Sequence, residues 1–400
     1  MLAYWIFFIF FTGLALLVSP SYRIIASDNF DLQKRVNPNA FIFKLICIFV
    51  LVFFIGFRYE VGGDWLNYKA SYFEVAKLNF YDAIFTSNDP LFGLINWIAG
   101  QLFTSDSSSY GPLNWRNNIL HGYVLVNIIA AIIFSIGLVR FSFRLPRPML
   151  GIVVAIPYLI NVVSMGYVRQ AAALGLIMYG ITLLQDNNIR RFVIFIIIAS
   201  LIHKASLLML PMAIFVSTRN RFWIFFGIGL LFLVMSTAIL ESAVERIFIH
   251  YIQSEYSSSG AIFRLGMLIP PSVIFLYYKS RFGFSDVFSN LWTLFSLASI
   301  FLFSLLFFTS FSTFIDRIAL FLLPLQIAIF ASLPDIFPKN NRAFIIIGIV
   351  LYSCLVMFVW LNFAVNSWAW VPYENILFFC LLYTSPSPRD ATLSRMPSSA

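Results

Sequence analysis

The stretch FIFKLICIFVLVFFIG (residues 41–56) is an apolar run with a single charged side chain, Lys44. A helix needs about 20 largely apolar residues to cross the hydrocarbon core of a bilayer, so the run predicts a membrane span over 41–57. The next residues, FRYEVGGDWLNYKASYFE (57–74), bring an arginine, a diglycine, an aspartate and several aromatics. The hydrocarbon core rejects such polar groups, so the chain leaves the bilayer at this point.

The composition extends this prediction to the whole chain. Of the 400 residues, 60% are hydrophobic, 18% aromatic and only 11% charged, and the mean hydropathy is +0.88. A soluble domain of this length could not cover so much apolar surface with so few charges. We therefore expect an all-α, polytopic integral membrane helix bundle, with a single membrane domain over 1–383 and a large first outer loop over 58–119.

The apolar runs predict about 12 to 13 spans. Two neighbouring runs, 191–202 and 205–216, are short; they are either tilted spans or one helix kinked between His203 and Pro211. The run 90–104 is also short and is either re-entrant or interfacial. The candidate spans are 2–20, 41–57, 120–139, 149–165, 170–184, 191–202, 205–216, 221–240, 264–278, 287–309, 317–333 and 343–362.

Basic residues are concentrated in alternate loops. With residue 1 outside and 90–104 not crossing, one set of loops holds about 15 basic and about 5 acidic residues, and the other about 9 basic and about 11 acidic. Loops rich in Lys and Arg stay in the cytoplasm. This pattern predicts a multi-pass protein in which the loops rich in Lys and Arg face the cytoplasm.

The charge and cysteine content exclude several classes of function. A net charge of +9 would suggest nucleic acid as the partner of a soluble protein, but here membrane topology accounts for the charges, and we expect no nucleic-acid partner. Cys47, Cys354 and Cys380 lie in separate apolar runs without His or Cys at ligand spacing. We therefore expect no disulfide framework, metal site or cofactor.

The last residues, TSPSPRDATLSRMPSSA (384–400), differ in composition from the rest. A disordered tail is one interpretation. We favour a non-native sequence joined to a truncated gene, because the preceding apolar run begins near Asn375 and stops after about nine residues, too few to cross.

Polar side chains without an obvious structural role collect on the expected outer face. Ionisable groups at membrane depth cost several kcal/mol unless they are paired or hydrated, so such a collection predicts a functional site. The residues are Arg58, Asp64, Tyr68, Arg169, Gln170, His203, Lys204, Glu245, His250, Glu255, Arg264, Asp316, Arg317 and Glu374.

Four of these residues are arginines, which suit a phosphate ligand because the planar guanidinium donates two parallel hydrogen bonds and keeps its charge. Each could instead be an interfacial anchor that extends its charge toward water. Four on the outer side, against the cytoplasmic bias of basic residues, favour a lipid-linked phosphate or pyrophosphate. They are Arg58, Arg169, Arg264 and Arg317.

The diglycine at Gly62 and Gly63 permits a backbone turn with positive φ, or close approach by a substrate. In a helix after Gly63, Trp65, Tyr68 and Tyr72 would share one face. These aromatics form either an interfacial belt or stacking surfaces for sugars.

Five motifs, in this order, resemble the EpsG-like family of bacterial Wzy-type polysaccharide polymerases. They are FRYEVGGDWLNY, NDPLFGLINWIAG, YVRQAAALGLIMYGI, HKASLLMLP and DRIALFLLPLQ. One departure is Asp89 in NDPLFG, where the family often has Glu followed by Gly. The positions that match the family pattern are Arg58, Gly63, Asp64, Tyr68, Arg169, Gln170, His203, Ser206 and Arg317.

The resemblance implies a glycosyltransferase that makes exopolysaccharide, capsule or O-antigen at the outer leaflet. Such an enzyme moves a glycan from undecaprenyl pyrophosphate to the non-reducing sugar of another lipid-linked repeat unit. Its implied partners are that lipid-linked glycan and membrane lipids, with a chain-length regulator and a flippase as further candidates.

Two kinds of group are needed for this reaction. Arg169, Arg264 and Arg317, with Arg58 as a weaker fourth, would stabilise the pyrophosphate, beside Gly63, Tyr68 and Gln170 in substrate binding. His203, Asp64 or Asp316 would take the acceptor proton. Each base has a structural alternative: His203 as a helix-terminal hydrogen-bonding residue, Asp64 as an N-cap, and Asp316 as the counter-charge of Arg317.

Two other classes compete with a polymerase. A flippase or transporter would be expected to show internal repeats and interrupted spans near the midplane, and we find no clear repeat. A membrane acyltransferase that modifies a glycan would usually carry a close His-Asp pair, and neither His121 nor His203 has such a neighbour in the sequence.

Overall fold

The computed structural model describes residues 1–17, 38–85, 89–103, 112–185, 188–212, 260–308 and 312–378. The expected span 221–240, the side chains of Glu245, His250 and Glu255, and the segment 384–400 lie outside the described residues. Within the described part the chain is almost entirely helical, as the composition predicts.

The α-helices have these bounds: α1 Leu2–Leu17, α2 Pro38–Gly56, α3 Trp65–Ala76, α4 Phe80–Phe85, α5 Pro90–Phe103, α6 Pro112–Ser142, α7 Pro148–Ala155, α8 Ser164–Gly166, α9 Val168–Gln185, α10 Ile189–Ile202, α13 Ala261–Gly266, α14 Ile269–Tyr278, α15 Asp286–Leu305, α16 Ser312–Ala319, α17 Leu323–Ser332 and α18 Lys339–Phe363. A π-helical segment, Ile156–Val163, joins α7 to α8. Short 3-10 segments include Lys204–Met209, Leu320–Leu322, Leu333–Ile336 and Ser367–Ala369. The two strands are β1 Arg58–Tyr59 and β2 Glu374–Asn375.

In the described residues, 6 helical segments have the length and composition to cross a membrane. They are Gly122–Ser142, Pro148–Gly166, Ala261–Arg281, Asp286–Leu305, Ser312–Ile336 and Lys339–Phe363. Shorter apolar helices cover Leu2–Leu17, Phe41–Gly56, Pro90–Phe103 and Val168–Leu184. The membrane bundle is thus confirmed, but the expected count of about 12 to 13 spans is not.

The short run 191–202 ends where the backbone of His203 becomes extended, with φ −152° and ψ 107°. A 3-10 segment over Lys204–Met209 follows in place of a continued α-helix. The helix α10 therefore ends in an interruption at His203.

The centre of the bundle is the span made by α7, the π-helical segment and α8, whose apolar window is wholly buried. All ten residues of α17 are buried as well. By contrast, α18 exposes Phe344, Leu351 and Leu355. An apolar helix with an exposed apolar face fits contact with lipid tails, whereas the π-helical segment is surrounded by protein.

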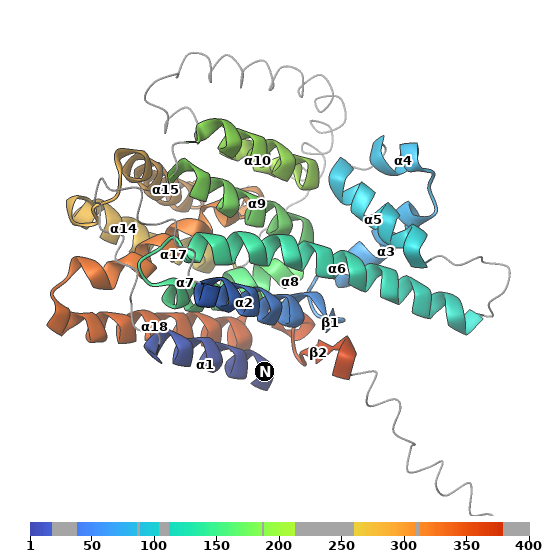
Figure 1. Cartoon of the computed structure of the whole chain (residues 1–400), viewed down its shortest axis with the longest axis horizontal. Coiled ribbons are helices and arrows are strands. Elements are labelled where there is room, and N and C mark those ends of the chain that lie inside the picture. Colours follow the sequence, from blue (N-terminus) through green and yellow to red (C-terminus); the bar gives the residue numbers. More distant parts are fainter. Residues whose placement is uncertain are drawn as a thin grey trace, which may run out of the picture.

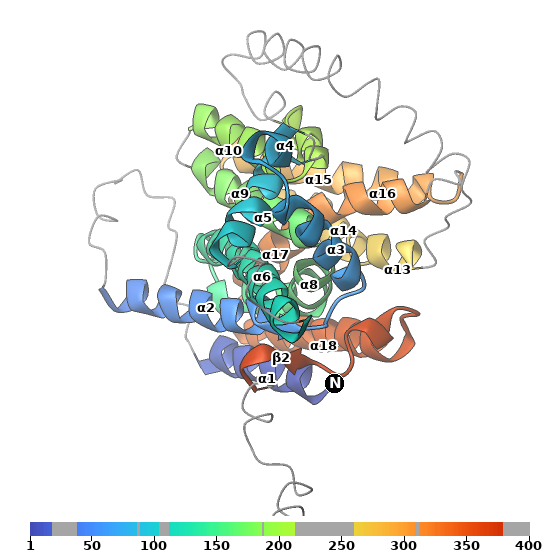
Figure 2. The same cartoon turned by 90° about the vertical axis from the view of Figure 1, so that its right-hand side faces the viewer.

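The helices α3, α4 and α5 gather beside α6 at one end of the bundle (Figures 1 and 2). This layer lies within the expected first outer loop, and α5 covers the short run 90–104. Trp97 on α5 donates a hydrogen bond to the carbonyl of Leu78 (3.1 Å), which ties α5 to the turn between α3 and α4.

At that same end, the segment after α18 holds the beginning of the first loop through antiparallel pairing of β1 with β2. Around this pair, Gly62 donates its N–H to the carbonyl of Ala369 (2.8 Å), and Ile376 donates its N–H to the carbonyl of Phe57 (2.8 Å). We call this arrangement the β1–β2 clasp.

The structure shows why one residue of the diglycine, Gly62, has to be glycine. Its φ is +116°, and a Cβ there would collide with the carbonyl oxygen of Met165. Gly63 has no such φ, and a Cβ would make only ordinary contact with Trp370, at 3.5 Å. The turn therefore requires glycine at 62 for backbone reasons, but not at 63.

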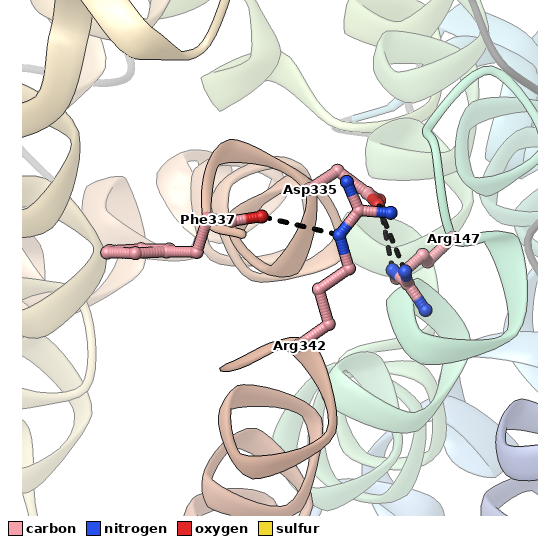
Figure 3. Close-up of polar contacts among 4 residues, drawn as sticks. All are labelled: Arg147, Asp335, Phe337 and Arg342. Atoms are coloured by element: carbon pink, nitrogen blue, oxygen red, sulfur yellow. Dashed lines mark hydrogen bonds and ion pairs between the residues drawn. The ribbon is translucent and has the colours of Figure 1, made fainter. Parts of the chain in front are cut away.

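A second set of loops meets around Asp335 (Figure 3). Arg147 donates two hydrogen bonds of 2.9 Å to this carboxylate, and Arg342 lies 3.4 Å from one of its oxygens. Arg342 also donates to the carbonyl of Phe337 (3.3 Å). The residues after α6 and before α18 therefore share one side of the bundle, as the charge pattern predicts.

Candidate functional site

Arg58 is held entirely within the protein. Its side chain is buried, and its guanidinium donates hydrogen bonds to the carbonyls of Ile55 (2.7 Å), Val61 (3.0 Å) and Met165 (2.9 Å). A fourth bond goes to Oδ1 of Asn127 on α6 (2.9 Å). These contacts give Arg58 a role in fixing the turn after α2; the expectation that it binds pyrophosphate stays a prediction.

Asp64 occupies the N-cap position of α3 without capping it through its side chain. The carboxylate is partly exposed, and Asn67 donates to it at a long distance, 3.4 Å. The N-cap alternative therefore does not account for this carboxylate, which remains accessible beside the loop turn. Gly63, next to it, is exposed.

Arg169 and His203 come from two neighbouring helices. Arg169 lies in the first turn of α9, and His203 follows the last residue of α10. Because α9 and α10 are joined by a short connection and pack side by side (Figure 1), the start of one and the end of the other lie at the same end of the bundle. The two motifs, far apart in the sequence, thus come together.

Asp89, at the start of α5, connects these two residues. Its Oδ2 lies 2.6 Å from Nη1 of Arg169, and its Oδ1 accepts the backbone N–H of Lys204 at 3.1 Å. In the sequence, Asp89 stands out only as a departure from a family pattern. Its position directly before a proline marks the start of a helix, but its partners are distant in the sequence and could not be predicted.

The rings of Tyr68 and Phe92 lie beside Arg169. The Arg169 guanidinium carbon is 5.4 Å from the Tyr68 ring centroid and 5.9 Å from that of Phe92. At these distances the aromatic faces attract the cation. Tyr68 thus joins the candidate site on α3. Trp65 and Tyr72, which were expected to share its face, are instead buried in the core, because they pack against α6.

His203 is partly buried against Phe321, with ring centroids 6.1 Å apart. Burial, followed by the positive charges of Arg169 and Arg317, lowers the pKa of its imidazole to about 3. The imidazole is consequently neutral at physiological pH. Among the described residues its Nε2 is buried and has no hydrogen-bond partner. A neutral imidazole carries one nitrogen that can accept a proton.

Arg317 enters the site from α16. Its guanidinium carbon lies 5.6 Å from the Tyr167 ring centroid, and its backbone carbonyl accepts a hydrogen bond from the amide of Gln170 (2.9 Å). In the described part of the chain, Nε of Arg317 has no hydrogen-bond partner. Gln170 is therefore a buried link between α9 and α16, and Arg317 keeps donor capacity for a ligand.

Asp316 pairs with Arg264, and not with its sequence neighbour Arg317. Nε of Arg264 and Oδ1 of Asp316 lie 2.8 Å apart, an ion pair whose geometry is not that of a hydrogen bond. The side chains are 19% and 8% exposed, so the pair is largely withdrawn from water. Asp316 is thus already engaged, which makes it a weaker candidate base than His203 or Asp64.

Tyr167, which sequence reasoning missed, lies near both Arg317 and Arg264. It occupies the single residue between α8 and α9. Burial raises the pKa of its hydroxyl, an effect that Arg264 and Arg317 oppose. Tyr158, in the π-helical segment, also lies near Arg264. The tyrosine that begins YVRQ resembles many interfacial tyrosines, so only the fold distinguishes it.

We call this assembly the outer-end cluster, because most of its residues were expected on the outer face of the membrane. Its arginines favour anions, and its candidate proton acceptors are His203 and Asp64. In the described residues, no group of three or more His, Cys, Asp or Glu side chains could hold a metal ion. The cluster comprises Asp64, Tyr68, Asp89, Tyr167, Arg169, Gln170, His203, Arg264, Asp316 and Arg317.

A family model described as the EpsG family matches residues 41–375. The chain belongs to the EpsG family. No curated protein and no solved structure matches the chain. The EpsG match includes the whole outer-end cluster and both strands of the clasp, so it covers the parts of the chain that build the site. Membership in EpsG indicates a membrane protein of polysaccharide biosynthesis.

Proposed function

We propose that this EpsG protein is a metal-independent, Wzy-type glycosyltransferase. It would polymerise undecaprenyl-pyrophosphate-linked oligosaccharide repeat units at the outer leaflet of the bacterial inner membrane, giving exopolysaccharide, capsule or O-antigen. The observation that carries the proposal is the convergence of two arginines, Arg169 and Arg317, on the neutral imidazole of His203. A transfer from a pyrophosphate needs cationic donors and a proton acceptor in one place.

In the proposed reaction, the acceptor hydroxyl oxygen forms a bond to the anomeric carbon of the donor glycan. The bond between that carbon and the pyrophosphate oxygen breaks, and the pyrophosphate departs with the electron pair. Arg169 and Arg317 stabilise the charge that develops on the leaving oxygen. The hydroxyl proton goes to Nε2 of His203, with Asp64 as the alternative acceptor.

Substrate binding would improve His203 as a base. Burial, and after it the two arginines, lowers the pKa of the His203 imidazole. A bound pyrophosphate places negative charge beside the same arginines, and a nearby negative charge favours the protonated imidazolium. The pKa of His203 therefore rises when the donor is bound, toward the range in which a base accepts protons efficiently.

The proposal is tested by deleting the gene in the bacterium that carries it. We expect lipid-linked single repeat units to accumulate and long polymer to disappear. Plasmid-borne wild-type protein should restore polymer, whereas Arg317→Ala should restore about 100-fold less or worse, the usual cost of losing one such donor. Arg191→Ala, an exposed arginine at the opposite end of α10, is the matched control and should restore polymer fully.

The same strain separates the competing classes. Single units that remain in the inner leaflet, out of reach of an external glycosidase, would indicate a flippase. Polymer of normal length that lacks acyl groups would indicate an acyltransferase. Either result would contradict polymerisation.

A further inference from the structure

Asp89 is a buried carboxylate to which the proposed chemistry gives no task. Its side chain is only 5% exposed and lies at the first residue before α5, in the layer that covers the outer-end cluster. Placing an ionised carboxylate away from water costs several kcal/mol unless partners compensate. Its position therefore calls for an explanation beyond starting a helix.

The two carboxylate oxygens have different partners. Oδ2 pairs with Nη1 of Arg169 at 2.6 Å, and Oδ1 accepts the backbone N–H of Lys204 at 3.1 Å. That N–H belongs to the peptide bond between His203 and Lys204. A single side chain on α5 thus reaches both α9 and the end of α10.

The same peptide group is held at its carbonyl as well. The His203 carbonyl accepts the N–H of Ser206 at 2.9 Å, so the peptide group between His203 and Lys204 is held at both of its polar atoms. The imidazole itself lies against Phe321. These contacts fix the backbone from which the imidazole extends and pack one face of its ring.

Arg169 is fixed in a corresponding way but is not enclosed. Asp89 holds Nη1, and Tyr68 and Phe92 lie beside the guanidinium. Even so, 37% of the Arg169 side chain is exposed, against 5% for Asp89. The guanidinium is therefore anchored at one nitrogen while the rest of it can reach a ligand.

We propose that Asp89 is a positioning residue that sets the relative placement of Arg169 and His203, the two groups that would contact the leaving pyrophosphate and the acceptor hydroxyl. The inference rests on the proposed function and deepens it. It assigns α5 of the first outer loop a direct part in organising the reaction centre. Displacement of a reacting group by about 1 Å can cost roughly 100-fold in rate, so such a residue affects turnover more than binding.

The test uses the full-length protein in proteoliposomes, with the lipid-linked repeat unit extracted from the deletion strain as substrate. Asp89→Asn keeps an oxygen for the Lys204 N–H but removes the charge that holds Arg169. We expect kcat to fall about 100-fold, with KM changing less than about three-fold. Asp89→Glu, which restores the charge, should recover part of kcat. Asp82→Asn, a carboxylate of the same loop layer on α4, is the control and should behave as wild type.

Two further measurements distinguish positioning from support of the fold. Binding of undecaprenyl pyrophosphate, followed by tryptophan fluorescence, and the thermal unfolding midpoint in detergent should both stay close to wild type in Asp89→Asn. In an Arg169→Gln background, Asp89→Asn should cost less than about three-fold more, because coupled residues are not additive.

The inference is overturned if Asp89→Asn keeps kcat within two-fold of wild type, or if its loss is matched by loss of folded protein or of binding. If the deletion strain accumulates no lipid-linked single unit, the proposed function itself fails and this inference with it. These two failures are separate observations.

Discussion

Among single residues, hydrogen bonding and exposure distinguish the arginines that support the fold from those accessible to a ligand. Arg58 donates four hydrogen bonds to protein atoms, three of them to carbonyls. The side chain of Arg169 is 37% exposed and that of Arg317 is partly exposed, so both are accessible to a ligand. The same residue type thus has different roles at one end of the bundle, and different substitutions will reveal them.

For Arg58, we expect Arg58→Met to destabilise the protein by about 3 kcal/mol or more, because it leaves buried carbonyls without donors. Arg58→Lys should also destabilise it, since one ammonium cannot replace a planar guanidinium with several directed donors. The unfolding midpoint in detergent and the amount of protein in the membrane measure this. A stable Arg58→Lys with a specifically raised KM would instead support pyrophosphate binding by Arg58.

His203 gives a prediction about pH. Its pKa of about 3 in the empty site means that kcat/KM, which reports the free enzyme, should not decline near pH 6.5 through this group. Bound pyrophosphate raises the imidazole pKa, so the acid limb of kcat should lie at higher pH than that of kcat/KM. Rate profiles from pH 5 to 9 for wild type and His203→Gln check the order of the two limbs. An acid limb of kcat/KM at about 6.5 that disappears in His203→Gln would contradict this environment for His203.

At the scale of elements, the turn after β1 is the most demanding piece of backbone in the site. We expect Gly62→Ala to destabilise the protein by about 1–3 kcal/mol, because an L side chain is strained at this φ and its Cβ meets the Met165 carbonyl. Gly63→Ala is the matched control, since a Cβ there has ordinary contacts only. The thermal unfolding midpoints of the two variants test this prediction. Equal midpoints would show that the turn relaxes to accept the side chain.

The membrane-spanning helices could be predicted from the sequence, whereas the contacts between helices could not. The expected spans 149–165 and 343–362 agree closely with Pro148–Gly166 and Lys339–Phe363, because the thickness of the hydrocarbon core fixes the length of an apolar run. The π-helical geometry at Ile156–Val163 leaves no such signal in the length of the apolar run.

The partners of the site residues could not be predicted from the sequence. Asp316 seemed suited to Arg317 because they are neighbours, but successive residues on a helix point in different directions, and Asp316 meets Arg264. Arg58 bonds to Asn127 and Met165, 69 and 107 residues away. The sequence placed the site residues on one face, whereas their partners depend on how the helices pack.

At the scale of the whole molecule, the outer-end cluster and the Asp335 ion pairs lie on opposite sides of the bundle, which predicts a labelling pattern. We expect a single cysteine at Leu66, which is 71% exposed, to react with an impermeant reagent in intact cells. A cysteine at the exposed Asn340 should react only after the inner membrane is permeabilised. Both are made in a background without Cys47, Cys354 and Cys380.

The reverse labelling pattern would place the cluster on the cytoplasmic side and would contradict a reaction at the outer leaflet. Labelling of both sites in intact cells would mean that Asn340 does not lie in the cytoplasm. The same background accepts cysteines at Asp64 and His203, which should be reached from the same side as Leu66.

The β1–β2 clasp has a consequence for synthesis. Asn375 donates a hydrogen bond to the carbonyl of Phe53, 322 residues earlier in the chain. A ribosome delivers residues in order, so the first loop is made long before the strand that pairs with it. We therefore expect this loop to lack its partner strand while the later spans are inserted. On the proposed function, the site would be completed among the last events of biogenesis, and a chain released before β2 would occupy the membrane without acting on the lipid-linked glycan pool.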